Sequence, residues 1–394
     1  MGTLFHWSSL GPGKSHQVKR RAILIGLGRI GWALEKDKLR YHPCTHAGSL
    51  LSLQKRIELV AVCDSNPDQV KSFQRWWPYP VQAFENPDEL FSVIVGTGKK
   101  SPQSANPREK ATIRKGAIAF KSKSSGKSKN ATSSGKSSGG LAVDLAIVAT
   151  PQDVHTSQAL QLMTLGVSDV LIEKPPGEDS SDMRKLRNAM QSSKSQLWIN
   201  FERRFHPGYT RVRQLIESRS LGELRSVRGR VYSGASPIHP ASGPLLHDAV
   251  HWIDLLFWYC GLPEKMTGRV LRNSKGLEES SHLQFHYPDF VASLTTGARS
   301  RYFEFEMELD FTEGRIHCGN NGFRMWKSKR SKRYSGFQEL QEVAFSIPGK
   351  EKNPWLQMYA ALASASQKPE EYDSQRTLQG LATVDYIHRA YKSL

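Results

Sequence analysis

A lysine and a group of histidines and carboxylates are the residues of this sequence best suited to chemistry. Lys174 follows a short apolar run and precedes two prolines, while His247, Asp248 and His251 lie within five residues of one another. A partly desolvated lysine amine can accept a hydroxyl proton, and histidine is the side chain that most readily relays one near neutral pH. These residue types suit proton transfer to or from an alcohol.

The spacing of the histidines and aspartates predicts one helical face but leaves roles open. On a continuous helix His247, His251 and Asp254 share a stripe, and Asp248 lies three residues before His251. The same stretch is similar to the zinc motif HExxH, so a zinc hydrolase using His247 and His251 is an alternative. That alternative leaves the glycine-rich loop and the Glu-Lys-Pro run unexplained, and we expect no metal ligands.

A glycine-rich loop near the amino terminus indicates a dinucleotide site. The sequence GLGRIG, residues 26–31, follows the apolar run 22–27 and precedes a predicted helix. Glycines in such a loop permit a tight turn, close approach of a pyrophosphate and close packing of helix on strand. The predicted cofactor contacts in this loop are Gly26, Gly28, Arg29, Ile30 and Gly31.

An acidic residue after the second apolar run supports the same site. Asp64 follows residues 57–63 and is placed to accept a hydrogen bond from a ribose hydroxyl. It lies 33 residues after Gly31, because residues 32–45 look like an extra piece within the first crossover. Since no arginine adjoins Asp64, the sequence favours NAD, with NADP possible.

These residues need an open parallel sheet to bring them together. Apolar runs at residues 22–27, 57–63, 145–149, 170–172 and 197–199 alternate with helical patterns such as 154–165 and 181–190. The alternation predicts an α/β Rossmann domain with a doubly wound parallel sheet, which we assign to residues 19–175. Loops at the carboxyl ends of its strands carry further predicted cofactor contacts: Thr150, Pro151, His155, Glu173 and Lys174.

The pattern changes after Pro175. Longer alternating strands at residues 282–287, 290–296 and 302–311 favour an antiparallel sheet with one covered face. Helical patterns at residues 355–365 and 377–391 follow them. We therefore expect residues 176–394 to form a C-terminal α+β domain for substrate binding and oligomerisation.

Much of the formal net charge of +18 is local. From Thr97 to Gly140, eleven lysines or arginines stand against the single acid Glu109, a net of +10. We predict a disordered basic insertion at residues 96–140 and a mobile arm at residues 1–18. Because Phe120 is the insertion's one aromatic, we expect no nucleic-acid partner. No apolar stretch is long enough for a membrane span, and scattered cysteines without a signal peptide suggest a cytoplasmic protein.

Several motifs, taken in order, resemble the Gfo/Idh/MocA oxidoreductases, named for glucose-fructose oxidoreductase, inositol dehydrogenase and a rhizopine-catabolism protein. The resemblance runs from about residue 19 to residue 262, outside the two insertions. Its motifs are GLGRIG at 26–31, His46-Ala47, ATPxxxH at 149–155, EKP at 173–175, NFERRF at 200–205 with Pro207, LGE at 221–223 and HxxD at 251–254.

The resemblance implies an NAD(P)-dependent oxidoreductase acting on the CH–OH group of a sugar, cyclitol or derivative. It also implies an open, mainly antiparallel sheet in the second domain and a homo-oligomer. It places Lys174 near the reacting hydroxyl. By alignment with the family's helix, we interpret His251 as the proton acceptor or relay, with His247 or Asp248 orienting it or the substrate hydroxyls. We expect Arg203 and Arg204 to contact the sugar-like substrate. His247 stands where the family often has aspartate, so an NAD-binding sensor or scaffold without turnover is a second alternative.

Overall fold

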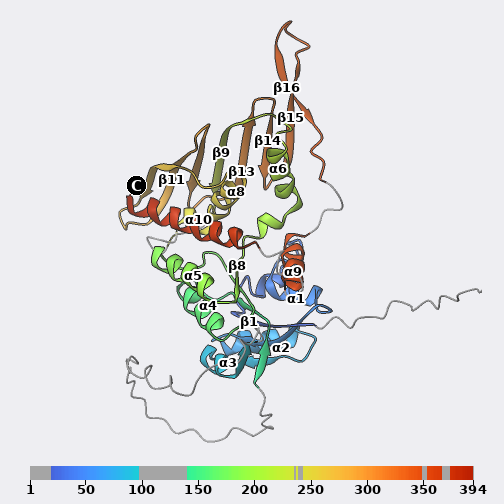
Figure 1. Cartoon of the computed structure of the whole chain (residues 1–394), viewed down its shortest axis with the longest axis vertical. Helices are drawn as coiled ribbons and strands as arrows, with labels where there is room; N and C mark the ends of the chain where they lie inside the picture. Colours follow the sequence, from blue (N-terminus) through green and yellow to red (C-terminus); the bar gives the residue numbers. More distant parts are fainter. Residues whose placement is uncertain are drawn as a thin grey trace, which may run out of the picture.

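The structure is a computed structural model that describes residues 19–96, 140–234, 237, 243–347, 353–365 and 373–393. These residues form a Rossmann domain and a second domain built on a large sheet (Figure 1). The predicted mobile arm lies outside the described residues, and so does the predicted disordered insertion apart from its two end glycines. The predicted fold class is confirmed.

The Rossmann domain contains a six-stranded parallel sheet in the order β3-β2-β1-β6-β7-β8. Five strands coincide with the predicted apolar runs: β1 (Arg20–Ile25), β2 (Ile57–Cys63), β6 (Leu145–Val148), β7 (Asp169–Ile172) and β8 (Gln196–Ile199). The sixth, β3 (Gln82–Phe84), lies at one edge. Strand order reverses between β1 and β6, so the carboxyl ends of β1, β2, β6 and β7 meet at the crevice where such sheets bind ligands.

Helices bury both faces of this sheet. One face packs on α4 (His155–Thr164) and α5 (Ser180–Ser192), and α3 (Pro87–Val93) contributes to the same core. The other face packs on α1 (His46–Ser52), α2 (Pro67–Trp76) and α9 (Pro354–Ser364). The α9 segment was predicted to belong to the second domain, whereas in the structure it packs on the Rossmann sheet.

A small parallel pair brackets the basic insertion. Strand β4 (Ile94–Gly96) pairs with β5 (Leu141–Val143), with Gly96 opposite Val143. The two described segments that flank residues 97–139 therefore pair with each other just before β6 begins. This is the place at which the sequence predicted an insertion.

The second domain contains an eight-stranded sheet in the order β10-β11-β12-β9-β13-β14-β15-β16. Its neighbours pair antiparallel except β12 with β9, which confirms the predicted mainly antiparallel sheet. Its strands are β9 (Leu224–Tyr232), β10 (Lys265–Arg272), β11 (Glu278–His286), β12 (Val291–Gly297), β13 (Glu304–Phe311), β14 (Gly314–Gly319), β15 (Gly322–Arg330) and β16 (Gln338–Val343).

One face of this sheet is covered by helices and carries the apolar residues of each strand. In β9, Val227 and Val231 are buried, whereas Arg228 and Arg230 between them are exposed. The covering helices are α6 (Pro207–Glu217), α8 (Val250–Cys260) and α10 (Ser374–Ser393) (Figure 1). Helix α8 is almost entirely buried, which fixes its position between sheet and Rossmann domain.

Candidate active site

The three glycines of the GLGRIG loop meet three different steric demands. Gly26 has φ of +94°, and an added Cβ would lie 2.4 Å from the Ala149 carbonyl oxygen. A Cβ on Gly31 would lie 2.1 Å from the Gly26 carbonyl oxygen, whereas one on Gly28 would meet nothing within 4 Å. The loop therefore packs tightly at both ends and leaves an open cradle at Gly28, as a pyrophosphate site requires.

The helix expected directly after this loop is interrupted. The chain instead forms a turn and the short 3-10 helix η1 (Ala33–Lys36), and α1 begins only at His46. The His46 and Ala47 amides then donate to the Ile30 and Gly31 carbonyls, at 3.1 and 2.9 Å. Because α1 satisfies the carbonyls of the glycine loop, the predicted extra piece at residues 32–45 is an insertion within the first helix.

Asp64 joins the glycine loop to the end of β2. Its Oδ2 accepts from the Leu27 amide at 2.6 Å and its Oδ1 from the Asn66 amide at 2.8 Å. A carboxylate has about four acceptor sites, so lone pairs remain for hydroxyls. Ribose binding by Asp64 stays a prediction, with a suitable position.

His155 is a brace between two loops, and its predicted role as a cofactor contact stays a prediction. The side chain is 2% exposed, with Nδ1 2.8 Å from the Pro175 carbonyl and Nε2 2.7 Å from the Thr150 carbonyl. Both ring nitrogens are thus occupied by backbone. Thr150 itself donates to Gln158 at 2.8 Å, and Pro151 is exposed at the mouth of the loop.

Glu173 is likewise an anchor, and its predicted contact with the cofactor stays a prediction. Its carboxylate lies 2.8 Å from His46 Nε2 and accepts hydrogen bonds from the Asn200 amide group and the Lys174 backbone amide. Burial opposes the charged form, but the hydrogen bonds from His46 and Asn200 and the charge of Lys174 hold the pKa of Glu173 below its ordinary value. The buried anion fixes the backbone at Lys174.

Lys174 links the two domains. It follows β7, and its Nζ donates to the His247 carbonyl at 2.6 Å. His247 ends the short helix α7 (Pro244–His247), while α8 begins at Val250. The predicted single stripe of His247, His251 and Asp254 is therefore broken at the junction of two helices. The His247 ring is 64% exposed and lies 3.1 Å from Asp248 Oδ1.

His251 faces Glu202, a residue that the sequence reasoning missed. His251 Nδ1 lies 3.7 Å from Glu202 Oε2, and the two side chains are 12% and 21% exposed. Burial, followed by the positive charges of Lys174 and Arg203, lowers the pKa of His251 well below 6.5. Burial raises the pKa of Glu202, with Arg203 opposing and Glu173 adding to the shift. A neutral imidazole and a carboxyl with raised proton affinity therefore lie side by side.

The two arginines after Glu202 have different environments. Arg204 is 5% exposed and forms a two-pronged ion pair with Asp254, and its third donor group binds the Arg376 carbonyl. This occupied guanidinium corrects the prediction that Arg204 contacts substrate. Arg203 is partly buried, donates to Tyr209 at 3.1 Å and lies 3.9 Å from the Phe305 ring centroid. Substrate contact by Arg203 stays a prediction.

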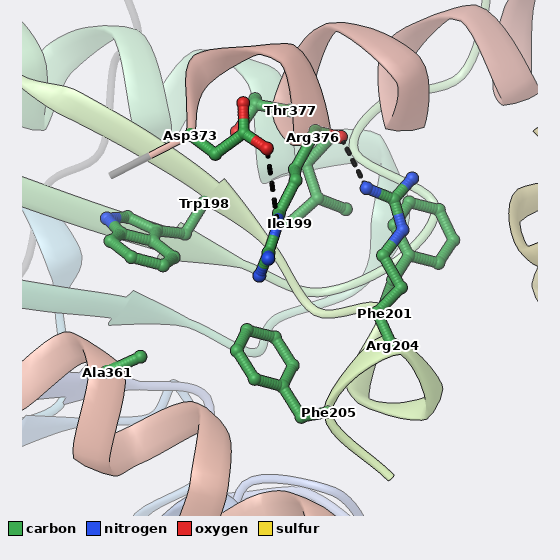
Figure 2. A pocket seen from close by; sticks show the side chains of 9 residues that line it. All are labelled: Trp198, Ile199, Phe201, Arg204, Phe205, Ala361, Asp373, Arg376 and Thr377. Carbon is green, nitrogen blue, oxygen red and sulfur yellow. Dashed lines mark hydrogen bonds and ion pairs between the residues drawn. The ribbon is translucent and has the colours of Figure 1, made fainter. Parts of the chain in front are cut away.

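A pocket beside β8 is lined in part by Arg204, but not by Lys174 or His251 (Figure 2). Arg376 in this pocket pairs with Asp373 at 3.3 Å. It therefore adds no group to the candidate active site. The lining side chains are Trp198, Ile199, Phe201, Arg204, Phe205, Ala361, Asp373, Arg376 and Thr377.

The zinc-hydrolase alternative finds no support in the described part of the chain. The group of potential metal ligands found there consists of Glu35, His42 and Cys44 and does not include His247 or His251. The break between α7 and α8 separates the two histidines of the supposed motif.

Among the described residues, no helix combines the length and apolar character needed to cross a bilayer.

The open cradle gives a prediction for Gly28→Ala. The added methyl meets no protein atom, so stability should change by less than about 0.5 kcal/mol. It occupies the space predicted for the pyrophosphate, so NADH binding should weaken by about 1–3 kcal/mol, roughly 5- to 150-fold in Kd. Fluorescence titration and urea unfolding measure the two effects. Gly26→Ala is the contrasting variant and should destabilise the fold; unchanged NADH affinity in Gly28→Ala would contradict the assignment.

Comparisons with known proteins identify the family and the fold. A model for the GFO/IDH/MocA C-terminal domain matches residues 209–317, and one described as oxidoreductase family, NAD-binding Rossmann fold, matches residues 92–201. An inositol 2-dehydrogenase of Corynebacterium glutamicum strain R is 31% identical over 122 residues, 30% of this chain and 36% of that protein. A bovine trans-1,2-dihydrobenzene-1,2-diol dehydrogenase is 24% identical over 180 residues, 44% and 53% of the two chains. The chain therefore matches about a third to a half of the length of these relatives.

Solved structures share the fold over nearly the whole chain. The WlbA dehydrogenase from Bordetella pertussis, solved with NADH and UDP-GlcNAcA, has a TM-score of 0.65 at 17% identity and covers 95% of this chain and 96% of its own. The putative oxidoreductase yvaA from Bacillus subtilis has a TM-score of 0.67 at 15% identity, with 97% of both chains covered. At these identities the likeness concerns the fold alone.

Proposed function

The chain belongs to the Gfo/Idh/MocA family of oxidoreductases, and from this premise we propose that it is an NAD(P)-dependent dehydrogenase or reductase acting on a CH–OH group. The observation that carries the proposal is the meeting of Lys174 with the α7–α8 junction. Its Nζ reaches the His247 carbonyl at 2.6 Å, and its charge acts on His251. Proton-handling groups from both domains thus converge at the sheet edge that carries the glycine loop.

In this proposal Gly28 and Asp64 hold the cofactor, and Lys174 and His251 handle the substrate proton. Bound NAD(P) supplies the acceptor for hydride from the carbinol carbon. The hydroxyl proton leaves to the neutral His251 imidazole, or to Lys174 once its ammonium group has released a proton to solvent, and Glu202 takes the proton from His251 or returns it. Arg203 supplies positive charge near the developing alkoxide.

The substrate class follows from the polar groups around Lys174. The exposed His247 ring and the Asp248 carboxylate suit hydrogen bonds to several neighbouring hydroxyls. Burial opposes the charged form of Asp248, but hydrogen bonds from His247 and Ser233, together with the charges of His247 and Lys174, hold its pKa below the ordinary value. We therefore propose a sugar, a cyclitol or a derivative as the substrate, with NAD preferred over NADP. The homo-oligomer and the cytoplasmic location expected from the sequence are proposed as well.

A substrate screen tests this function. The full chain is incubated with sugars, cyclitols and sugar acids, each with NAD and with NADP, and the absorbance of the reduced cofactor is followed. Turnover with a polyhydroxylated ring that is lost in His251→Ala supports the proposal. Binding of NADH without turnover on any substrate favours the sensor or scaffold alternative, for which His247 in place of the family's aspartate is the motive. Failure to bind either cofactor overturns both.

The pH profile of alcohol oxidation gives a further prediction. His251 must be neutral to accept a proton, so activity is present above its pKa and is lost as the pH falls through it. Because burial and the charges of Lys174 and Arg203 lower this pKa, we expect the acid limb of kcat/KM to lie well below pH 6.5. His251→Gln should remove that limb. A limb at or above pH 6.5 in the wild-type protein would contradict the role of His251.

A further inference from the structure

The insertion that interrupts the first helix brings three chemically distinct ligand groups together. Glu35 in η1, His42 and Cys44 each offer an atom, and these atoms all lie within 4.8 Å of one another. His42 Nδ1 is 2.9 Å from Glu35 Oε1, and Cys44 Sγ is 3.8 Å from both His42 Nδ1 and Glu35 Oε2. These residues lie outside the active site described above.

The separations agree with those around a single tetrahedral ion. Ligand atoms bound at about 2.0–2.3 Å from zinc lie roughly 3.3–3.6 Å from one another. The separations of 2.9 Å from Nδ1 to Oε1 and 3.8 Å from Sγ to Nδ1 and to Oε2 lie on either side of that range. Because they involve both oxygens of the Glu35 carboxylate, rotation of this carboxylate and small side-chain shifts would bring one oxygen into the site. Three protein ligands would leave a fourth position for water.

The hydrogen bonds of His42 point to a cation at Nδ1. Its Nε2 lies 2.9 Å from the Asp37 carbonyl, and its Nδ1 faces the Glu35 carboxylate. Both partners are hydrogen-bond acceptors, and a metal ion at Nδ1 would satisfy the Glu35 contact while Nε2–H donates to the Asp37 carbonyl. An imidazole that binds metal through one nitrogen and donates its other N–H to a backbone carbonyl is the usual arrangement in metal sites.

The surrounding chain holds the three ligands in place. Thr45 donates to Glu35 Oε2 at 2.6 Å, and a Cβ on Gly48 would lie 2.3 Å from the Glu35 carboxylate. Between His42 and Cys44, the Pro43 carbonyl accepts a 2.9 Å hydrogen bond from the buried Asn353. The His42 ring is 35% exposed, which gives an ion a path from solvent.

We propose that Glu35, His42 and Cys44 form a binding site for one zinc-like divalent ion. A thiolate and an imidazole favour zinc or cobalt over magnesium or calcium, which prefer oxygen ligands. The ion joins η1 and the end of the insertion to the amino terminus of α1. Since α1 is hydrogen-bonded to the glycine loop, metal binding stabilises the region that positions the cofactor.

Cobalt substitution tests the site without measuring turnover. The full chain is stripped of metal with a chelator and titrated with Co²⁺, and the near-ultraviolet thiolate-to-cobalt charge-transfer band is recorded. We expect the band to saturate at one Co²⁺ per chain and to disappear when Zn²⁺ is added. Cys44→Ser and His42→Gln should lose the band. Cys260→Ser, which removes another partly buried free thiol, should keep it.

Thermal unfolding separates loss of the site from loss of the fold. With chelator present, Cys44→Ser should unfold at the temperature of the wild type, and Zn²⁺ should raise that temperature only in the wild type. The proposal is overturned if the wild type shows no band and no stabilisation by Zn²⁺. It is also overturned if the band survives in Cys44→Ser or depends on Cys260. None of these readouts uses the proposed dehydrogenase activity, so the two proposals fail separately.

Discussion

Lys174→Met should lower kcat for alcohol oxidation by about 10²- to 10⁴-fold, the range typical of a lost proton-transfer group. Methionine keeps the unbranched shape of the side chain and removes only the amine, whose hydrogen bond goes to the His247 carbonyl. The buried Glu173 anchor and the glycine loop remain, so NADH binding should persist. Steady-state kinetics and fluorescence titration of the same preparation measure the two quantities.

The pH profile tests whether the charge of Lys174 acts on His251. After burial, the Lys174 charge is the largest cause of the lowered pKa of His251, so its removal should shift the acid limb upward. A lysine whose charge did not reach His251 would lower the rate without that shift. Lys185→Met removes an exposed lysine paired with Asp182 and should leave both rate and limb unchanged. Full turnover in Lys174→Met would exclude the assigned role.

The sheet of the Rossmann domain was predictable because parallel strands buried on both faces appear as continuous apolar runs. The run at residues 57–63 is β2 itself, and β6 and β8 begin at the predicted run or one residue before it. The packing of α9 on the Rossmann sheet was not predictable in this way. An apolar helix face can pack on the core of either domain, and it is the folded chain that brings the Tyr359 hydroxyl to 2.7 Å from His46 Nδ1.

Motifs located the candidate site but not the direction in which each side chain points. Thr150 and His155 belong to one motif, yet Thr150 is partly exposed, whereas His155 is buried and contacts the Thr150 carbonyl. Arg203 and Arg204 are adjacent, and only Arg204 meets a buried carboxylate. In the sequence, Glu202 stands beside two arginines, a pattern that suggests an ion pair at the surface. Its contact with His251 depends on the packing of η3 (Glu202–Phe205) against α8, which a linear pattern does not encode.

Two further arrangements depend on local backbone geometry. The α7 helix ends at His247 and the chain turns before α8, so a spacing that fits one helix is divided between two. In the insertion, Glu35 approaches Cys44 and Thr45 because η1 folds back toward the amino terminus of α1, a contact that the linear sequence does not show.

The second large effect is expected for Asp254→Asn, which should destabilise the protein by about 3–5 kcal/mol because it leaves the Arg204 charge buried without a partner. The two side chains are 3% and 1% exposed, so water cannot replace the lost carboxylate. Urea unfolding followed by tryptophan fluorescence measures the change. Glu217→Gln, which breaks an exposed pair with Arg213 on α6, should change stability by less than about 0.5 kcal/mol.

A double variant tests whether the unpaired charge causes the loss. Arg204→Met combined with Asp254→Leu removes both charges and should recover most of the stability, since apolar pairs often replace buried ion pairs without loss. The pair joins η3, which carries Glu202, to α8, which carries His251 one turn before Asp254. The double variant should therefore fold, yet turn over more slowly if the ion pair sets the distance between Glu202 and His251. Destabilisation by Asp254→Asn below about 1 kcal/mol would show that the pair does not fix η3 against α8.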